Sequence, residues 1–300
     1  GEESSVTATA TGAAYNDKTV AGANKVSYTG VALQGTGAGN YSLAATTAEG
    51  VGTIAKRALT VGTVTAQTKT YDGTTAADAA EFQATLGNLV AGEESSVAAT
   101  AMGAAYNDKN VAGANRIDYT GIALTGTGAA NYTVADTAQG AGTITKRALT
   151  LGEVTAQTKT YDGTRAADAS KFRAALGNVV TGEENSVTAT AADASYNDKN
   201  VVQANAVSYT GVSLTGTGAG NYSIVNTAQG TGTIAKRTLT VGAVTAQTKT
   251  YDGTTAADAA AFRATLDNVV AGEESSVTAT ATGAAYNDKN VAGANKVSYT

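Results

Sequence analysis

A repeat of 90 residues constrains this chain more than any other feature. The ten-residue string TAQTKTYDGT occurs unchanged at 65–74, 155–164 and 245–254. The same spacing separates the only three phenylalanines, Phe82, Phe172 and Phe262. Solenoid repeats of roughly 20–45 residues are shorter, whereas about 90 residues suffice for one small domain. The sequence therefore predicts a string of small domains.

The phase of the repeat predicts four parts. Residues 1–55 are the C-terminal part of a repeat, 56–145 and 146–235 are complete repeats, and 236–300 are the N-terminal part of a repeat. Both ends cut through a repeat, so we expect this stretch to be a window from a longer protein. No Gly/Ser-rich linker separates the repeats around Lys146-Arg147, which predicts a stiff connection.

Composition excludes several kinds of chemistry. The chain has no Cys, and therefore no disulfide, thiolate nucleophile or zinc–thiolate site. It also has no His, the commonest general base and metal ligand. With 20 basic against 25 acidic residues, it lacks the positive charge that a nucleic-acid or anionic membrane surface needs. We therefore expect no enzyme, no nucleic-acid partner and no membrane insertion in this stretch.

Alternating apolar residues predict a mainly β unit. The expected strands of the second repeat are 58–61, 65–71, 97–101, 117–124, 132–134 and 143–145. Gly62 and Gly121 interrupt two of them and suggest bulges. The Asp72-Gly73 dipeptide marks a turn.

One short helix is expected after that turn, over 74–88. Thr75 and Asp78 resemble a capping box, and Phe82 and Leu86 share a helical face at i and i+4. The predicted fold class is thus mainly β: tandem domains of about 90 residues, each with one short helix, arranged as an extended rod. Two architectures stay open, a β-grasp-like sheet over the helix and an immunoglobulin-like sandwich. A β-helix is disfavoured because no short rung repeat recurs.

At KTYDGTT, followed by KNVAGAN, LTGTGAGNY and ITKRALT, the unit resembles the YDG repeat and is similar to the related MBG repeats. Such repeats occur in very large surface proteins of Gram-negative bacteria, including filamentous-haemagglutinin-like adhesins. The resemblance covers the whole chain, repeat by repeat. It implies an extracellular, mainly β module without catalytic activity, repeated in a stalk at the cell surface.

Calcium is the one metal for which the sequence offers candidate ligands. Asp108 and Asn110, with Asp198 and Asn200 in the next repeat, could supply side-chain oxygens. A calcium ion takes about six to eight oxygens, more than this loop contains. The alternative is an Asx turn, in which the side chain accepts bonds from nearby backbone. No cofactor and no catalytic residue is predicted.

Three further features have two interpretations each. Asn40, Asn131 and Asn221 stand in N-Y-[ST] sequons, which predict either glycosylation or simply the start of a strand. Tyr28, Tyr119 and Tyr209 could contact sugars, although tyrosines alternating with Val or Ile usually belong to the core. The recurring acidic pair at Glu93-Glu94 is expected to form a solvated turn.

These observations favour a structural function, the stalk of a secreted adhesin or matrix fibre. One alternative is a self-assembling filament or surface layer, because Thr-rich strands without proline leave sheet edges open to other copies. Another is a repeated carbohydrate-binding module with a matrix polysaccharide as partner. In each case the first expected partners are neighbouring repeats of the same chain.

Overall fold

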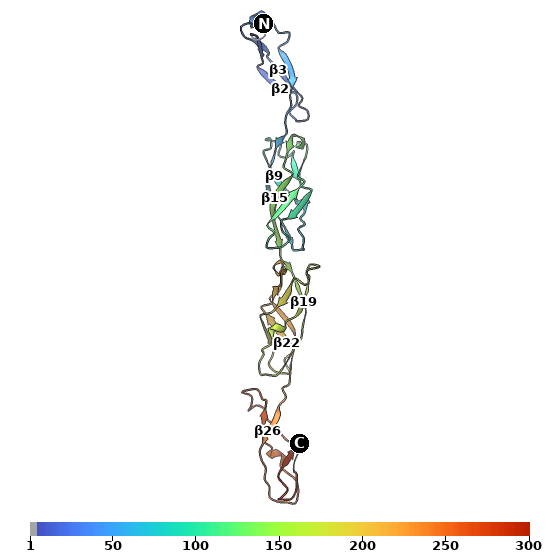
Figure 1. Cartoon of the computed structure of the whole chain (residues 1–300), viewed down its shortest axis with the longest axis vertical. Coiled ribbons are helices and arrows are strands. Elements are labelled where there is room, and N and C mark those ends of the chain that lie inside the picture. The colour runs from blue at the N-terminus through green and yellow to red at the C-terminus, as the bar shows by residue number, and fades with distance from the viewer. Residues whose placement is uncertain (1–4) are drawn as a thin grey trace. The chain divides into compact units, whose positions relative to one another are not determined.

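The computed structural model describes residues 5–300, which form two compact units. The first unit contains the chain up to Ala148 together with Gly220–Ser223, and the second contains Leu149–Ala219 and Ile224–Thr300. Figure 1 shows strands throughout the chain. Within residues 5–300, no helix has the length and apolar character needed to cross a membrane.

The complete repeat of the first unit is built on a four-stranded sheet. Its order is β11 (Gly103–Tyr106), β12 (Arg116–Thr120), β15 (Thr137–Thr145) and β8 (Gln67–Thr70). The first three strands pair antiparallel, and β8 joins β15 in parallel. Three two-stranded pairs complete the repeat: β6 (Arg57–Ala58) with β14 (Tyr132–Thr133), β7 (Thr60–Val64) with β9 (Ala84–Gly87), and β10 (Ala98–Thr100) with β13 (Ala123–Thr125).

The core of this repeat lies between β12, β15 and the β7–β9 pair. Ile117 and Tyr119 of β12 are fully buried, and the Phe82 ring lies 4.8 Å from the Tyr119 ring. Gly140 of β15 lets the layers approach closely, because a Cβ added there would lie 3.0 Å from Val64 Cγ1 of β7. Gly142 instead leaves room for the side chain of Ile117 on the neighbouring strand β12. A Cβ added at Gly142 would lie 2.6 Å from Ile117 Cγ1, so any side chain there would displace the core.

The first repeat contributes two smaller sheets to the same unit. Its strands are β1 (Thr7–Thr9), β2 (Gly12–Tyr15), β3 (Lys25–Thr29), β4 (Ala32–Gln34) and β5 (Thr47–Val51). β1 pairs with β4, and β2, β3 and β5 form one antiparallel sheet. Short 3-10 turns lie at η1 (Ala38–Asn40), η2 (Ala79–Glu81) and η3 (Ala129–Asn131).

The second unit repeats this arrangement, beginning with a sheet of order β18-β25-β22-β21. Its third-repeat elements are β17 (Thr150–Val154), β18 (Gln157–Thr160), η4 (Ala169–Lys171), β19 (Ala174–Gly177), β20 (Thr188–Thr190), β21 (Asp193–Tyr196), β22 (Ala206–Thr210), β23 (Ser213–Thr215) and β25 (Thr227–Ala235). The fourth repeat adds β26 (Thr240–Val244), η6 (Ala259–Ala261), β27 (Ala264–Asp267), β28 (Ala284–Tyr286) and β29 (Val297–Tyr299). The pair of β16 (Arg147–Ala148) and β24 (Tyr222–Ser223) belongs to the first unit, and β24 directly follows η5 (Ala219–Asn221) in sequence.

The mainly β prediction is confirmed, and strands form in each predicted region of the second repeat. The bulge at Gly62 is also confirmed, because the β7–β9 register shifts between Val61 and Val64. Gly121 has a different role. Its φ of 64° turns the chain between β12 and β13, which belong to different sheets, so the predicted strand over 117–124 is two strands.

The helix predicted over 74–88 was wrong. This segment contains one 3-10 turn, η2, capped by Asp78 and not by Thr75, and then the strand β9. Phe82, Ala84 and Leu86 face inward while the residues between them are exposed, which is the two-residue period of a strand. Pairing with β7 outweighs the helical propensity of alanine, since an isolated helix this short is marginal. No helix therefore covers a sheet in the described residues, and the layered sheets correspond to the sandwich alternative.

Candidate functional site

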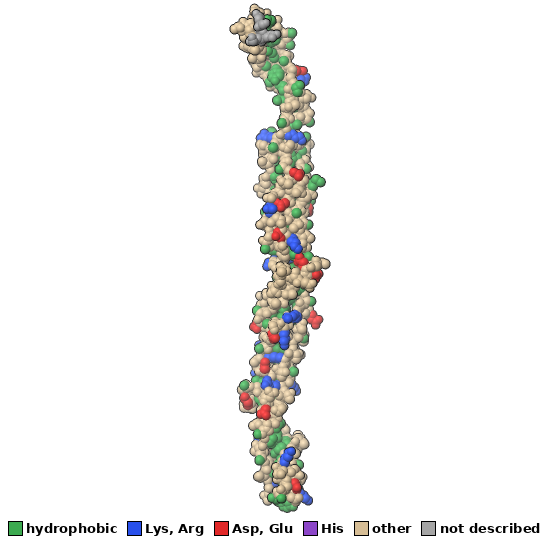
Figure 2. Space-filling model, in the orientation of Figure 1, with side chains coloured by type: hydrophobic (Ala, Val, Ile, Leu, Met, Phe, Trp, Pro, Cys, Tyr) green, Lys and Arg blue, Asp and Glu red, His purple; other side chains and the backbone are tan. Residues whose placement is uncertain are grey.

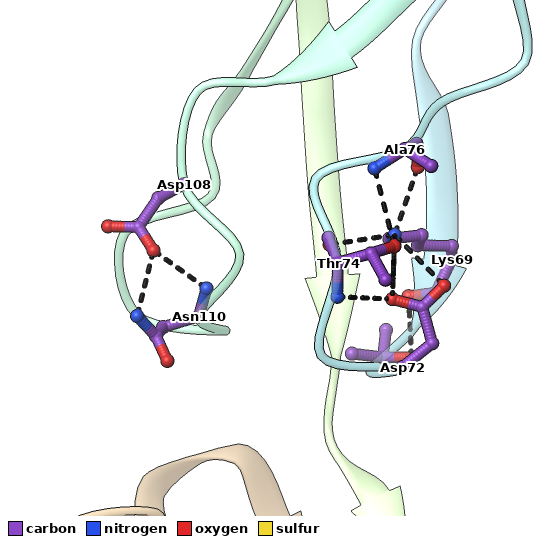
Figure 3. Close-up of polar contacts among 7 residues, drawn as sticks. Lys69, Asp72, Thr74, Ala76, Asp108 and Asn110 are labelled. Atoms are coloured by element: carbon purple, nitrogen blue, oxygen red, sulfur yellow. Dashed lines mark hydrogen bonds and ion pairs between the residues drawn. The ribbon is translucent and has the colours of Figure 1, made fainter. Parts of the chain in front are cut away.

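The YDG motif forms a turn around one lysine ammonium, which we call the lysine turn (residues 69–76). Lys69 Nζ donates to both carboxylate oxygens of Asp72, at 2.8 and 3.1 Å, as Figure 3 shows. It also donates to the backbone oxygens of Thr74 and Ala76, each at 2.9 Å, and to Thr74 Oγ1 at 3.1 Å. An ammonium carries three hydrogens. The five oxygens share them, so each N–H of the ammonium has an acceptor.

The local sequence explains why this turn forms. Asp72 Oδ1 accepts from the N–H and the Oγ1 of Thr74, both at 2.9 Å, which makes an Asx turn. Gly73 between them has a φ of 79°, a conformation that glycine adopts without strain. Lys, Asp, Gly and Thr of the K-x-Y-D-G-T string therefore each have a defined role in the turn.

The lysine turn recurs with the motif. Lys159 Nζ lies 2.7 Å from Asp162 Oδ1, and Lys249 Nζ lies 2.9 Å from Asp252 Oδ1. A tyrosine ring also lies over each ammonium, at 5.3, 5.3 and 5.5 Å for Tyr106, Tyr196 and Tyr286. These distances are within cation–π range.

The aspartates of the lysine turns are held in the ionised form. Burial alone would raise the pKa of Asp72 and Asp162, but hydrogen bonds from the lysine and the threonine outweigh it and lower the pKa of both carboxyls. At Asp252 the hydrogen bond from Lys249 is the main cause, and it lowers the pKa to about 2. The lysine and the aspartate thus form a stable ion pair, and the arrangement suits a structural role better than proton transfer.

The calcium candidates form a second turn. Asp108 Oδ1 accepts from the backbone N–H of Asn110 at 2.7 Å and from its Nδ2 at 2.9 Å (Figure 3). Asp198 and Asn200 make the same two bonds, at 2.7 and 2.9 Å. This is the geometry of the Asx turn. No group of three or more His, Cys, Asp or Glu side chains suited to a metal is present among residues 5–300.

Consecutive repeats of the first unit contact each other through an asparagine. Oδ1 of Asn131, in the second repeat, accepts from the backbone N–H of Val20, in the first, at 2.9 Å. Val20 directly follows another Asx turn, in which Asp17 Oδ1 accepts from the N–H of Thr19 at 2.7 Å. The turn therefore presents the Val20 N–H to the neighbouring repeat.

The segment Gly220–Ser223 makes the equivalent contact in the same unit. Asn221 Oδ1 accepts from the Val111 N–H at 2.9 Å, and Asn221 Nδ2 donates to Asn110 Oδ1 at 2.9 Å. The next residue, Tyr222, meets Tyr71 edge to face with ring centroids 5.3 Å apart. We call Asn131 and Asn221 the junction asparagines.

This contact gives the N-Y-[ST] sequence a structural role. Asn221 is buried, and its Nδ2, the atom to which a glycan would be attached, is bonded to Asn110. A glycan there would separate the two segments. Asn131 is half-buried, whereas Asn40 is exposed. The sequence-predicted modification is therefore incompatible with the contact at Asn221.

The sequence predicted that the acidic pairs form solvated turns, but in two of these pairs one glutamate accepts a hydrogen bond from a tyrosine. Glu93 Oε2 accepts from the Tyr132 hydroxyl at 2.6 Å. In the second unit, Glu273 of the fourth repeat accepts from the Tyr161 hydroxyl of the third, also at 2.6 Å. These bonds to carboxylates raise the pKa of both phenols. Sequence reasoning missed these partners because adjacent glutamates carry no mark of a tyrosine 39 or 112 positions away.

Tyr119 and Tyr209 are core residues, as their alternation with apolar neighbours indicated. Both are fully buried. Gln67 Nε2 donates to the Tyr119 hydroxyl at 2.8 Å, and Gln157 Nε2 to the Tyr209 hydroxyl at 2.7 Å. Neither tyrosine can therefore reach a sugar. Tyr28, in the partial first repeat, is exposed.

A family model described as the YDG domain matches residues 55–139, 145–230 and 235–300. Each match contains one lysine turn. No curated protein matches the chain. Because the three matches together cover well over half of its length, the chain belongs to the YDG domain family and carries the domain in tandem.

Proposed function

We propose that these tandem YDG domains are a non-catalytic structural region of an extracellular bacterial surface protein, in which they act as a stalk. One observation carries the proposal: neighbouring repeats bond to each other through specific side chains. Asn131 bonds to Val20 in the first unit, and Tyr161 bonds to Glu273 in the second. Such contacts would fix the angle between domains, as a stalk requires.

The surface supports this role. Figure 2 shows Lys and Arg side chains interspersed with Asp and Glu on the visible face, without one large patch of a single sign. A surface without a large patch of one sign limits nonspecific electrostatic binding to the producing cell. The absence of Cys and Pro also suits a chain that is exported unfolded, because no disulfide and no slow X-Pro isomerisation delays folding outside the cell.

The proposal predicts how size scales with repeat number. Small-angle X-ray scattering would compare the chain with one that carries an additional copy of residues 146–235 after Ala235, both at high dilution. A stiff stalk gains about 30 Å or more in maximum dimension for each 90-residue domain added. Freely jointed domains would instead grow roughly as the square root of their number. That second result, or no increase, would contradict a stalk.

A further inference from the structure

A groove with a volume of about 390 Å³ lies beside the β17–β19 pair in the third repeat, a complete repeat of the chain. All the residues that line it belong to the second unit. They include three apolar and three charged residues: Leu176, Val179, Val187, Glu153, Arg173 and Glu184. Small-molecule sites in proteins have volumes of about 300–1,000 Å³, largely apolar walls and a few polar groups. The groove has the size and the lining of such a site.

A threonine hydroxyl occupies the equivalent place in two other repeats. Thr85 Oγ1 accepts from the Thr63 N–H at 2.9 Å in the second repeat, and Thr265 Oγ1 accepts from the Ala243 N–H at 2.9 Å in the fourth. Both N–H groups belong to the bulge at which the register of the strand pair shifts. A bulge disrupts the ladder of backbone bonds. The threonine therefore supplies this bulge with a side-chain acceptor.

The third repeat has the same bulge without the hydroxyl. The β17–β19 register shifts between Leu151 and Val154, and Ala175 stands where the other two repeats have threonine. The Glu153 N–H therefore has no threonine hydroxyl as its acceptor. Glu153 and Ala175 both line the groove, so the place of the missing hydroxyl opens into it. A ligand oxygen in this place would accept from the Glu153 N–H.

The charged side chains of the groove leave further hydrogen-bonding capacity. Arg173 Nη1 donates to the backbone oxygens of Ser170 and Phe172, at 2.9 and 2.6 Å, which fixes the guanidinium. A guanidinium has five N–H groups, so others remain for a ligand. In the part of the chain that the structure describes, Arg173 forms no ion pair with Glu153 or Glu184. The groove thus offers N–H donors and carboxylate acceptors together.

This combination is specific to the third repeat among the three that contain the segment. The second repeat has the neutral residues Thr63 and Gln83 in place of Glu153 and Arg173. The fourth repeat keeps the arginine but has Ala243 in place of the glutamate. Both also retain the threonine that the third repeat lacks. The substitutions that remove the internal hydroxyl and add charged groups therefore coincide in one repeat.

We propose that this groove binds a neutral saccharide. A hydroxyl both donates and accepts, so one sugar hydroxyl accepts from the Glu153 N–H, in the place that a threonine hydroxyl occupies in the other repeats. Neighbouring hydroxyls donate to the carboxylates and accept from Arg173. An anionic ligand would meet two carboxylates, and a cationic ligand would meet the guanidinium. A neutral polyol uses both kinds of group, and its C–H faces contact Leu176 and Val187.

The saccharide site is independent of the stalk proposed above. It adds a binding function to one repeat, and an array of repeats of any stiffness could carry it. A failure to bind saccharides would leave the expected growth in length with repeat number unchanged. Freely jointed repeats would likewise leave the groove intact.

An NMR titration of the 300-residue chain tests the proposal. The probes are the neutral saccharides cellobiose, lactose, maltotriose and diacetylchitobiose, each up to about 10 mM. Sialyllactose and unacetylated chitobiose are the anionic and cationic comparators. We expect at least one neutral probe to bind with a dissociation constant in the millimolar range or below and to shift the Glu153 amide resonance. The two charged comparators should bind more weakly than that neutral probe.

Ala175→Thr is the decisive variant, because it installs the residue of the second and fourth repeats and should fold. It returns a hydroxyl to the Glu153 N–H and fills the ligand's place, so saccharide binding should weaken about tenfold or more. Ser195→Ala is the matched control. It also installs the residue of the second and fourth repeats, but Ser195 does not line the groove, and binding should not change.

Three results would overturn the proposal. The first is the absence of binding by every neutral probe at the highest concentration. The second is equal binding by Ala175→Thr and the unsubstituted chain. The third is tighter binding of a charged comparator than of any neutral probe, which would show that the groove selects its ligand by charge.

Discussion

The backbone N–H of Val20 donates to Oδ1 of Asn131 across 2.9 Å, although 111 residues separate them in sequence. The contact recurs between Val111 and Asn221, where the carboxamide also donates to Asn110. A carboxamide supplies an acceptor and a donor on one planar group. The same residue type thus recognises the same Asx turn twice, and the sequence that specifies this contact is itself repeated.

Substitution by aspartate should affect the contacts of the two junction asparagines differently. Asn131→Asp retains the oxygen that accepts from the Val20 N–H. We expect it to change the free energy of opening the contact between the two repeats by less than about 0.5 kcal/mol. Asn221→Asp replaces the donor to Asn110 with an oxygen facing an oxygen. It should lower the free energy of opening by roughly 1 to 3 kcal/mol.

Hydrogen exchange of the Val20 and Val111 amides, followed by NMR, measures both effects locally. Asn221→Ala is the matched control, because it removes the acceptor of the Val111 N–H as well as the donor to Asn110, so Val111 should lose at least as much protection as in Asn221→Asp. Equal protection of Val111 in all three chains would show that Asn221 does not hold this junction.

The lysine turn should contribute strongly to stability. Lys69→Met removes a charged donor that five oxygens share, which should lower the free energy of unfolding by about 1.5 to 3 kcal/mol. Lys25→Met is the control. Lys25 and its ion-pair partner Glu49 are both exposed, so this substitution should lower the free energy of unfolding by less than about 1 kcal/mol. Urea denaturation of both variants compares them, and equal losses would refute a special role for the turn.

Acid should weaken the lysine turns only at low pH. The folded-state pKa of Asp252 is lowered to about 2, below the value of about 3.9 for an unfolded aspartate. Its ionised form therefore favours the folded state, fully above about pH 4, and this stabilisation is lost as the pH falls toward the folded-state pKa. An NMR titration of the Asp252 carboxyl should have its midpoint near 2, and a midpoint near 4 would contradict the turn as described.

Calcium should not change stability. Asp108 Oδ1 already accepts two bonds from Asn110, and Asn110 Oδ1 accepts one from Asn221. These oxygens would have to give up their partners to bind an ion. We expect the same thermal unfolding midpoint in calcium and in chelator. A higher midpoint in calcium that Asp108→Asn abolishes would establish a metal site at this turn.

The sequence predicted the strands well but not the segment after YDG. Tyr119, Ile117 and the Gly62 bulge follow directly from alternation, because each strand has one buried face. The segment containing Phe82 and Leu86 has spacing that satisfies both a helix face and alternate residues of a strand. Pairing with β7 decides between them, and a tertiary contact of this kind has no local sequence signal.

The contacts between repeats were recognisable only in part. The recurrence of N-Y-[ST] marked Asn131 and Asn221 as special, but a sequon pattern also fits a surface modification. The bond from Asn131 to Val20 joins residues more than a repeat apart, and no periodicity within one repeat encodes it. The Asp108 and Asn110 turn was recognised as a feature, yet its role in orienting Asn110 toward Asn221 depends on the neighbour.

The central claim is that specific contacts hold neighbouring repeats in one orientation. The chain has no cysteine, so Val51→Cys and Met102→Cys, both exposed and in different repeats of the first unit, give one unique pair of sites for spin labels. Electron–electron double resonance at high dilution should give a single narrow distance distribution, broadened by Asn131→Ala. A broad distribution in the chain with Asn131 intact would contradict the account, because the repeats would then move independently.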